Sequence, residues 1–378
     1  MVTLQDFVLR AWKTLLSTNV YINKPVLDVA EMLNLGSPSR EHLKNWLGKK
    51  FNLYQDYVII NDNILHYNRL PADVIDLISE YTYFIIDLSH NPLTLDEYFE
   101  REWAKLVTNN KQKIIILSPD ANIIDIDPNI SDIESVYYTS YFHFEYLDKR
   151  YSVYDNVPVH KFSCLNSVPR MHRIILLNEL HRQSLINSIQ LSFWYNKQNH
   201  SKNYLSSDGY FLADKEMYAN EFSYFTKNVA DKCPILLDDG AVDDIHNPNE
   251  YTADYSIDSV AYKDTALNII TETSVTQQFF TEKTFKAIYA KQFFLLVCAP
   301  NSVDRLRKFG FDVYDDVIDH SYDKEPNLVK RINMIANEIA RLQNIDILGL
   351  HRELTDRRYA NYFHMMSPEF RRIVEIAK

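Results

Sequence analysis

The pattern of apolar and polar positions changes near residue 76. Before it, apolar residues recur at helical spacing in residues 6–16, 26–35 and 40–51. Residues 56–67 hold two apolar runs around an Asn-Asp-Asn turn, which predicts a β-hairpin. Residues 1–75 are therefore predicted to be a small helical module with a short β-ribbon.

From residue 76 the pattern becomes one of alternating strands and helices. Residues 83–89 and 113–120 are short apolar runs typical of buried strands, and residues 95–107 between them have helical spacing. A strand–helix–strand order predicts a parallel sheet. We assign residues 76–160 to a first Rossmann-like lobe.

The same alternation returns in the second half of the chain, and we assign residues 161–340 to a second Rossmann-like lobe. Its predicted strands are residues 159–166, 266–271 and 292–300, and its predicted helices are residues 170–185, 282–290 and 302–310, the last ended by Gly310. Residues 192–260 are predicted to be loops with short helices, and the acidic and aromatic run 311–323 a surface turn, with closure of a cleft as the alternative. Helical spacing from about residue 325 predicts a helical tail at 341–378.

Composition removes several classes of protein. A chain of 378 residues exceeds what one core usually organises, so two lobes facing a cleft are expected. Only six glycines are present, where average usage of about 7% would give roughly 26, and none are clustered. This disfavours P-loop NTPases and dehydrogenases with a GxGxxG motif, because both need clustered glycines to approach phosphates.

Charge and cysteine content restrict the partners and the compartment. The net charge of −11 argues against a broad nucleic-acid-coating surface. The cysteines Cys164, Cys233 and Cys298 have no metal-ligand spacing, so no metal site is expected and a reducing, cytoplasmic compartment fits. The sequence contains no signal-peptide pattern and no apolar run long enough for membrane insertion.

The segment from residue 266 to residue 300 carries the most specific chemistry. Glu272 follows a predicted strand, and Thr281, Glu282 and Lys283 open the next predicted helix. This is the carboxyl edge of a parallel sheet, where ligands bind. Thr281 is suited to cap the helix, Glu282 to accept hydrogen bonds from a ribose, and Lys283 to pair with a diphosphate. The alternative is that these residues only begin a helix.

This segment resembles the donor-binding motif of the α1,3-fucosyltransferases and related GT-B glycosyltransferases. The matching residues are Glu272-Thr273, Phe280, the Thr-Glu-Lys triplet at 281–283, and the strand at 292–300. Two positions depart from that family, which generally has Tyr at the position of Phe280 and Asn-Ser at the position of Thr273-Ser274. Neither fucose nor guanine is therefore carried over from the resemblance.

A second match lies upstream, where a strand and an Asn-Ser turn are followed by an Arg that opens a helix. Arg173, with Leu180 seven residues on, stands at that position. In the family this Arg contacts the donor diphosphate, so the resemblance gives that role to Arg173, with Arg170 as the competing candidate. The alternative for both is an ordinary solvated arginine at a helix start. The resemblance covers roughly residues 160–325 and implies a GT-B-like α/β fold.

The resemblance also implies an inverting, metal-independent transfer from a nucleotide-diphosphate sugar, with no cofactor besides that co-substrate. Such a reaction needs a general base near the acceptor hydroxyl and positive charge near the departing diphosphate. Asp87 is the first candidate for the base, His90 the second and Asp120 the third, because each ends a predicted strand of the first lobe. The Asp-Ile-Asp at 125–127 imitates a metal-binding DxD motif but lacks a preceding strand, and we interpret it as chance.

The N-terminal module has a winged-helix-like arrangement and resembles, more weakly, the DNA-binding regions of antirepressor-type proteins of phages and large DNA viruses. Arg40, Lys44, Lys49 and Lys50 would contact phosphates in such a role. A helical cap or oligomerisation element is the alternative. The hypothesis extends to the acceptor, which is a glycan or a modified base of viral DNA.

The leading interpretation is thus a glycosyltransferase with a nucleotide sugar as partner. The alternative is a nucleic-acid-binding regulator whose C-terminal lobe is a non-catalytic sugar-nucleotide fold, and a scaffold protein ranks last. The sugar, the nucleobase and the oligomeric state do not follow from the sequence.

Overall fold

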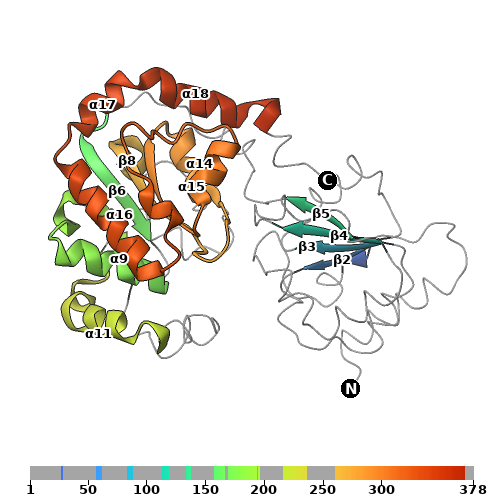
Figure 1. The fold of residues 1–378 in the computed structure, drawn as a ribbon, viewed down its shortest axis with the longest axis horizontal. Helices are drawn as coiled ribbons and strands as arrows, with labels where there is room; N and C mark the ends of the chain where they lie inside the picture. The colour runs from blue at the N-terminus through green and yellow to red at the C-terminus, as the bar shows by residue number, and fades with distance from the viewer. Residues whose placement is uncertain are drawn as a thin grey trace, which may run out of the picture. The chain divides into compact units, whose positions relative to one another are not determined.

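The structure is a computed structural model, and it describes residues 157–166, 169–193, 195, 216–235 and 260–370 together with five strands in the first 140 residues. Contacts divide the chain into two compact units, residues 1–140 with 374–378 and residues 141–373. Each unit contains one parallel sheet (Figure 1). The limits predicted for the four domains remain predictions.

The first unit holds a five-stranded sheet in the order β1-β2-β3-β4-β5. Its strands are β1 (Leu27–Asp28), β2 (Tyr57–Asn61), β3 (Tyr83–Asp87), β4 (Lys113–Ser118) and β5 (Ile133–Tyr137). All neighbours are parallel, and the register aligns Ile59, Ile85 and Ile115 across the three central strands. Ile59 and Ile85 are fully buried. The apolar runs at 83–89 and 113–120 are confirmed as strands of a parallel sheet.

The predicted hairpin is wrong for β2. This strand is paired in parallel with β1 on one side and β3 on the other, so neither edge remains for an antiparallel partner at Val58 and Ile59. A short apolar run has the same appearance in a hairpin and in a buried parallel strand, which explains the error. The predicted helices of residues 1–75 lie outside the described residues, as do Arg40, Lys44, Lys49, Lys50, His90 and Asp120.

The second unit holds a four-stranded parallel sheet in the order β7-β6-β8-β9. Its strands are β6 (His160–Asn166), β7 (Ile189–Phe193), β8 (Thr265–Thr271) and β9 (Phe293–Val297). Its α-helices are α9 (Met171–Arg182), α11 (Ala219–Asn228), α13 (Val260–Lys263), α14 (Glu282–Tyr289), α15 (Ser302–Lys308), α16 (Leu328–Gln343), α17 (Ile347–Glu353) and α18 (Thr355–Met366), and its 3₁₀ helices are η2 (Ile186–Ser188), η3 (Ala230–Lys232) and η4 (Ser321–Lys324). The predicted α/β class with a parallel sheet is confirmed for this unit.

The helices cover the sheet in two groups. α9 packs against α16 and α11, whereas α14 packs against β8, β9 and α18 (Figure 1). Every residue of β8 and β9 is buried, as expected for strands with helices on both faces. β7 instead alternates between buried and half-buried positions. Within the described residues no helix is long and apolar enough to cross a membrane.

The strand order of this sheet has a switch point between β6 and β8. From β6 the chain passes through α9 to β7 on one side, and it then returns to β8 on the other side of β6. In parallel sheets this change of direction opens a crevice at the carboxyl ends of the two strands, where ligands bind. The first turns of α9 and α14 follow these two strands, so both helices begin at this edge of the sheet.

Candidate functional site

Polar side chains meet at the carboxyl ends of β6 and β8. Asn166 ends β6 and accepts a hydrogen bond from the hydroxyl of Thr271, which ends β8. The next residue is Glu272, whose side chain is fully buried. Both strand ends therefore present oxygen and nitrogen atoms at the switch point of the sheet.

The carboxylate of Glu272 binds the first turn of α14. It accepts hydrogen bonds from the backbone amide of Thr281 at 3.0 Å, from the Thr281 hydroxyl at 2.5 Å and from the Thr284 hydroxyl at 2.6 Å. All three side chains are at most 1% exposed. Glu272 is among the predicted donor-binding residues, and in this structure its carboxylate fixes the start of α14 to the end of β8.

Thr281 caps α14 as predicted from its position. Its hydroxyl oxygen accepts from the backbone amide of Lys283 at 3.4 Å and from Lys283 Nζ at 3.2 Å. Lys283 Nζ also forms an ion pair with Glu282 at 2.5 Å. The side chain of Lys283 is 27% exposed, so it is partly open to solvent at the first helical turn.

Electrostatics keep Glu282 ionised. Burial favours its neutral acid, but Lys283 and then Lys286 outweigh burial and hold the pKa of Glu282 below its ordinary value. An ionised carboxylate accepts hydrogen bonds only, which suits it to a ligand with hydroxyl groups.

The first turn of α9 reaches the same strand end from the other side. Arg173 donates from its guanidinium to the carbonyl oxygen of Thr271 at 3.2 Å, and the ring of His172 lies 2.9 Å from the carbonyl oxygen of Glu272. Burial, followed by the charges of Arg173 and Arg170, lowers the pKa of His172 well below its ordinary value. The neutral ring therefore donates its Nε2 hydrogen to this carbonyl.

The two arginine candidates occupy different environments. Arg173 is 3% exposed, and burial together with the nearby Arg170 lowers the pKa of its guanidinium to about 10, against the opposing charges of Glu272 and Glu282. Arg170 is half-buried and is the N-cap residue of α9, where it makes no side-chain capping bond. The segments around residues 173 and 282, about a hundred positions apart in the sequence, thus meet at one strand end.

Phe280 and Asp87 are two further predicted site residues within the described residues. Phe280 is fully buried with its ring 6.1 Å from that of Phe309, so it belongs to the core in this structure. Asp87 is the last residue of β3, at the carboxyl edge of the first sheet. The sequence analysis did not identify His172, Asn166 or Thr284 as site residues. Asn166 is a polar residue at the end of a buried strand, and His172 and Thr284 are polar residues in the first turn of a helix that follows such a strand. These positions were the signal that could have found them.

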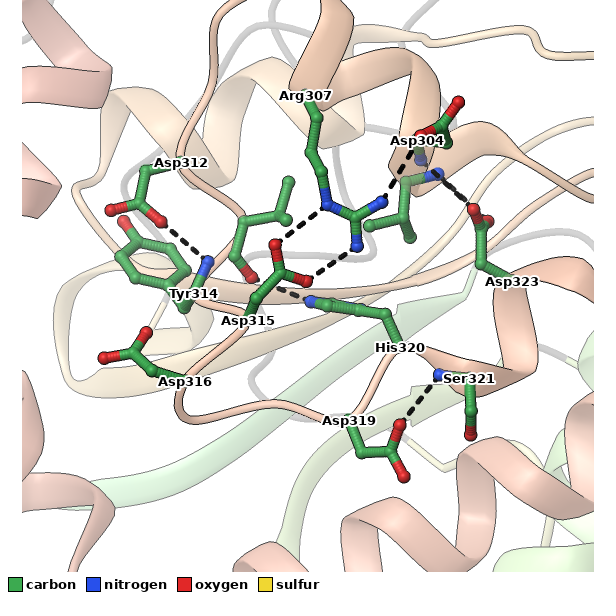
Figure 2. A network of polar contacts seen from close by, with 12 residues as sticks. Asp304, Arg307, Asp312, Tyr314, Asp315, Asp316, Asp319, His320, Ser321 and Asp323 are labelled. Atoms are coloured by element: carbon green, nitrogen blue, oxygen red, sulfur yellow. Dashed lines mark hydrogen bonds and ion pairs between the residues drawn. The ribbon is translucent and has the colours of Figure 1, made fainter.

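The acidic segment 311–323 has a structural role. Asp315 pairs with Arg307, and Asp312 and Asp316 both bind Arg357. Asp323 accepts hydrogen bonds from the backbone amides of Val303 and Asp304 at the start of α15 (Figure 2). These carboxylates hold the loop against α15 and α18. Among the residues that the structure describes, no group of His, Cys, Asp and Glu forms a metal site.

Comparisons with known proteins add little evidence about this site. No family model matches the sequence, and no curated protein matches it. A solved complex of S. aureus MnaA with UDP aligns with 96% of this chain and 92% of its own, at 11% sequence identity and a TM-score of 0.37. A likeness this low carries no argument about the fold or the ligand of this chain.

Proposed function

We propose that the protein is a glycosyltransferase that takes its sugar from a nucleotide-diphosphate donor bound at the carboxyl ends of β6 and β8. The observation that supports this most directly is the meeting of the two resembling segments at the switch point of the second sheet. Arg173 and Glu272 both belong to that meeting, because Arg173 binds the carbonyl of Thr271 and Glu272 fixes α14. The two sheets would be the acceptor and donor lobes of a GT-B-like enzyme.

We divide the donor contacts among these residues by their charge and burial. Lys283, at the first turn of α14, would offer its ammonium group to the diphosphate, assisted by the positive end of the helix dipole. The ionised carboxylate of Glu282 would accept hydrogen bonds from ribose hydroxyls. Arg170 is the better candidate for direct contact with the diphosphate, since the guanidinium of Arg173 is buried and bonded to β8.

The chemistry follows from these charges. A general base removes the proton of the acceptor hydroxyl, the oxygen attacks the anomeric carbon from the opposite face, and the nucleoside diphosphate departs with the bonding electrons. Positive charge near the diphosphate stabilises the leaving group without a metal. Asp87 is the proposed base, because it stands at the carboxyl edge of the first sheet. The acceptor is proposed to be a hydroxyl of a glycan or of a modified DNA base.

Binding of nucleoside diphosphates and their sugars, measured by calorimetry with and without Mg²⁺, tests the proposal. We expect selective, metal-independent binding that Lys283→Ala and Arg170→Ala each weaken about tenfold or more, a loss of about 1.4 kcal/mol. Lys308→Ala is the matched control, because Lys308 lies on α15, is 62% exposed and pairs with Asp304. Absence of binding, or equal losses in all three variants, would contradict the donor site.

A further inference from the structure

The loop between β8 and α14 is fixed at both of its ends. Glu272, at its start, accepts hydrogen bonds from the backbone amide and the hydroxyl of Thr281 at its far end. Near the far end, the side-chain oxygen of Gln278 accepts a hydrogen bond from Nε of Arg305 at 3.0 Å. These contacts leave residues 273–276, which we call the loop tip, to be placed by other groups.

The loop tip directly follows Glu272 at the carboxyl end of β8. Its first three residues are half-buried and Thr276 is exposed. The hydroxyl oxygen of Ser274 accepts hydrogen bonds from the backbone amides of Thr276 at 3.3 Å and Gln277 at 3.1 Å. The tip is therefore a closed local turn that begins at the proposed donor site.

Arg331, in the first turn of α16, ties the loop tip to the start of that helix. One terminal nitrogen of its guanidinium donates to the carbonyl oxygen of Val275 at 3.1 Å. The other donates to the carbonyl oxygens of Glu325 at 2.6 Å and Pro326 at 3.3 Å. Because the donors of a guanidinium form a rigid fork, one side chain holds both segments together.

Burial of this guanidinium is costly to the fold. The side chain of Arg331 is 2% exposed, and its printed partners are neutral carbonyl oxygens, which offset only part of the cost of removing a charge from water. Replacing buried charged groups by well-packed apolar residues is often neutral or stabilising. Arginine at this position is thus better explained by the placement of the loop tip than by stability alone.

The charge of Arg331 also acts at the proposed donor site. His172 binds the carbonyl oxygen of Glu272, the residue before the loop tip. Burial lowers the pKa of His172 most, and the charges of three arginines act in the same direction. In falling order of effect they are Arg173, Arg170 and Arg331. A substitution that tests the loop tip alone must therefore keep the positive charge.

We propose that Arg331 is a positioning residue of the donor site, where it holds the loop tip in place to contact the sugar of the bound donor. This inference rests on the proposed function, which assigns the charged groups of Lys283 and Arg170 to the diphosphate. Three of the four side chains of the tip carry hydroxyl groups, which donate and accept hydrogen bonds as the hydroxyls of a sugar require. Arg331 acts through the backbone of Val275 and does not itself touch the donor.

Calorimetry of the full chain with a nucleoside diphosphate and with its hexose conjugates separates the two parts of the donor. The probes are UDP, GDP, ADP, CDP and dTDP with their hexose conjugates, and the pair of highest affinity is used for the variants. We expect Arg331→Lys to weaken binding of the conjugate about tenfold and that of the nucleoside diphosphate less than about twofold, because Lys keeps the charge but lacks the fork. Arg331→Met removes the charge as well, so it should weaken binding of both.

Arg358→Lys is the matched control. Arg358 is also buried, and its guanidinium donates to the carbonyl oxygen of Lys291 at 2.7 Å, just beyond the other end of α14. Arg358→Lys should leave both affinities unchanged. Thermal unfolding of each variant verifies that it is folded and compares the losses of stability.

Amide hydrogen exchange of the full chain without nucleotide gives a readout that does not depend on the donor. The amides of Thr276 and Gln277 report on the loop tip, because both donate to Ser274 within it. Their exchange should become about tenfold faster in Arg331→Lys and stay unchanged in Arg358→Lys, since local opening is governed by local contacts.

Three results would overturn the inference. Equal losses of affinity for the conjugate and the nucleoside diphosphate in Arg331→Lys would assign its effect to the whole site. Unchanged exchange at the loop tip would show that Arg331 does not hold it, and equal losses in Arg358→Lys would assign the effect to stability. In each case nucleotide binding by the unchanged protein leaves the proposed function intact, whereas absence of binding to every probe overturns both.

Discussion

At the scale of single residues, the buried carboxylate of Glu272 accepts three hydrogen bonds from α14. Replacement by Ala leaves an amide and two hydroxyls without their acceptor in a place that excludes water. We therefore expect Glu272→Ala to lower the free energy of unfolding by about 2–4 kcal/mol in urea titrations. Glu353→Ala, at an exposed position of α17, should change it by less than about 0.5 kcal/mol. Equal effects of the two variants would show that Glu272 does not fix α14.

The lowered pKa of His351 predicts that the stability of the protein depends on pH. Its pKa is about 3 in the folded protein, lowered by burial and by Arg358, whereas an unfolded histidine titrates near 6.5. Between these values the unfolded chain binds a proton that the folded protein does not, so stability is lost as the pH falls below about 6.5. Urea unfolding at pH 7, 6 and 5 should show a smaller pH dependence in His351→Phe than in the unchanged protein, with the difference in slope approaching about 1.4 kcal/mol per pH unit below pH 6. Equal slopes would mean that the folded ring takes up a proton.

The sequence predicted where these polar residues stand relative to β8 and α14, whereas their roles toward a ligand stay predictions. Glu272, Thr281 and Lys283 were identified because polar residues at the ends of strands and starts of helices follow local rules. Those rules do not say which carboxylate turns inward. The burial of Glu272 and Phe280 depends on how α14 and Phe309 pack, which is a long-range property of the fold.

At the scale of elements, α15 depends on a residue outside it. Its own N-cap residue, Asn301, makes no side-chain capping bond, and the Asp323 carboxylate from η4 accepts from the amides of Val303 and Asp304 at 3.0 and 3.1 Å (Figure 2). We expect Asp323→Ala to lower the free energy of unfolding by about 1–2 kcal/mol, and Asp323→Asn, which keeps one acceptor, by less. Asp319→Ala removes a similar contact in the same segment, an exposed one to the Ser321 amide, and should cost less than either in urea titrations. An Asp323→Ala variant as stable as Asp319→Ala would contradict the capping role.

The elements that the sequence predicted are those with continuous apolar runs or clear helical spacing, such as β8, β9 and α16. β7 was missed because an edge strand of five residues alternates only between buried and half-buried positions. β2 was assigned to a hairpin because its partners come from distant parts of the chain. Strand pairing depends on contacts between segments far apart in sequence, and local periodicity does not contain them.

At the scale of the whole molecule, each unit contains a parallel sheet with a carboxyl edge, and the proposed function divides the chemistry between these two edges. In that proposal Lys283, on α14 of the second unit, acts on the donor, whereas Asp87, which ends β3 of the first sheet, acts on the acceptor. The two substitutions should therefore affect different steps. Lys283→Ala should weaken binding of the nucleotide, since it removes a charge from the diphosphate site.

Asp87→Asn should leave nucleotide affinity within about twofold and lower kcat for transfer by about 10²–10⁴, the usual contribution of a general base. Calorimetry with the nucleoside diphosphate and a transfer assay with labelled donor measure the two quantities on the same preparations. Asp28→Asn, at the end of the two-residue strand β1 in the same sheet, is the matched control. A loss of nucleotide binding in Asp87→Asn would assign this residue to the donor, and full transfer activity would leave the general base to another residue of the chain.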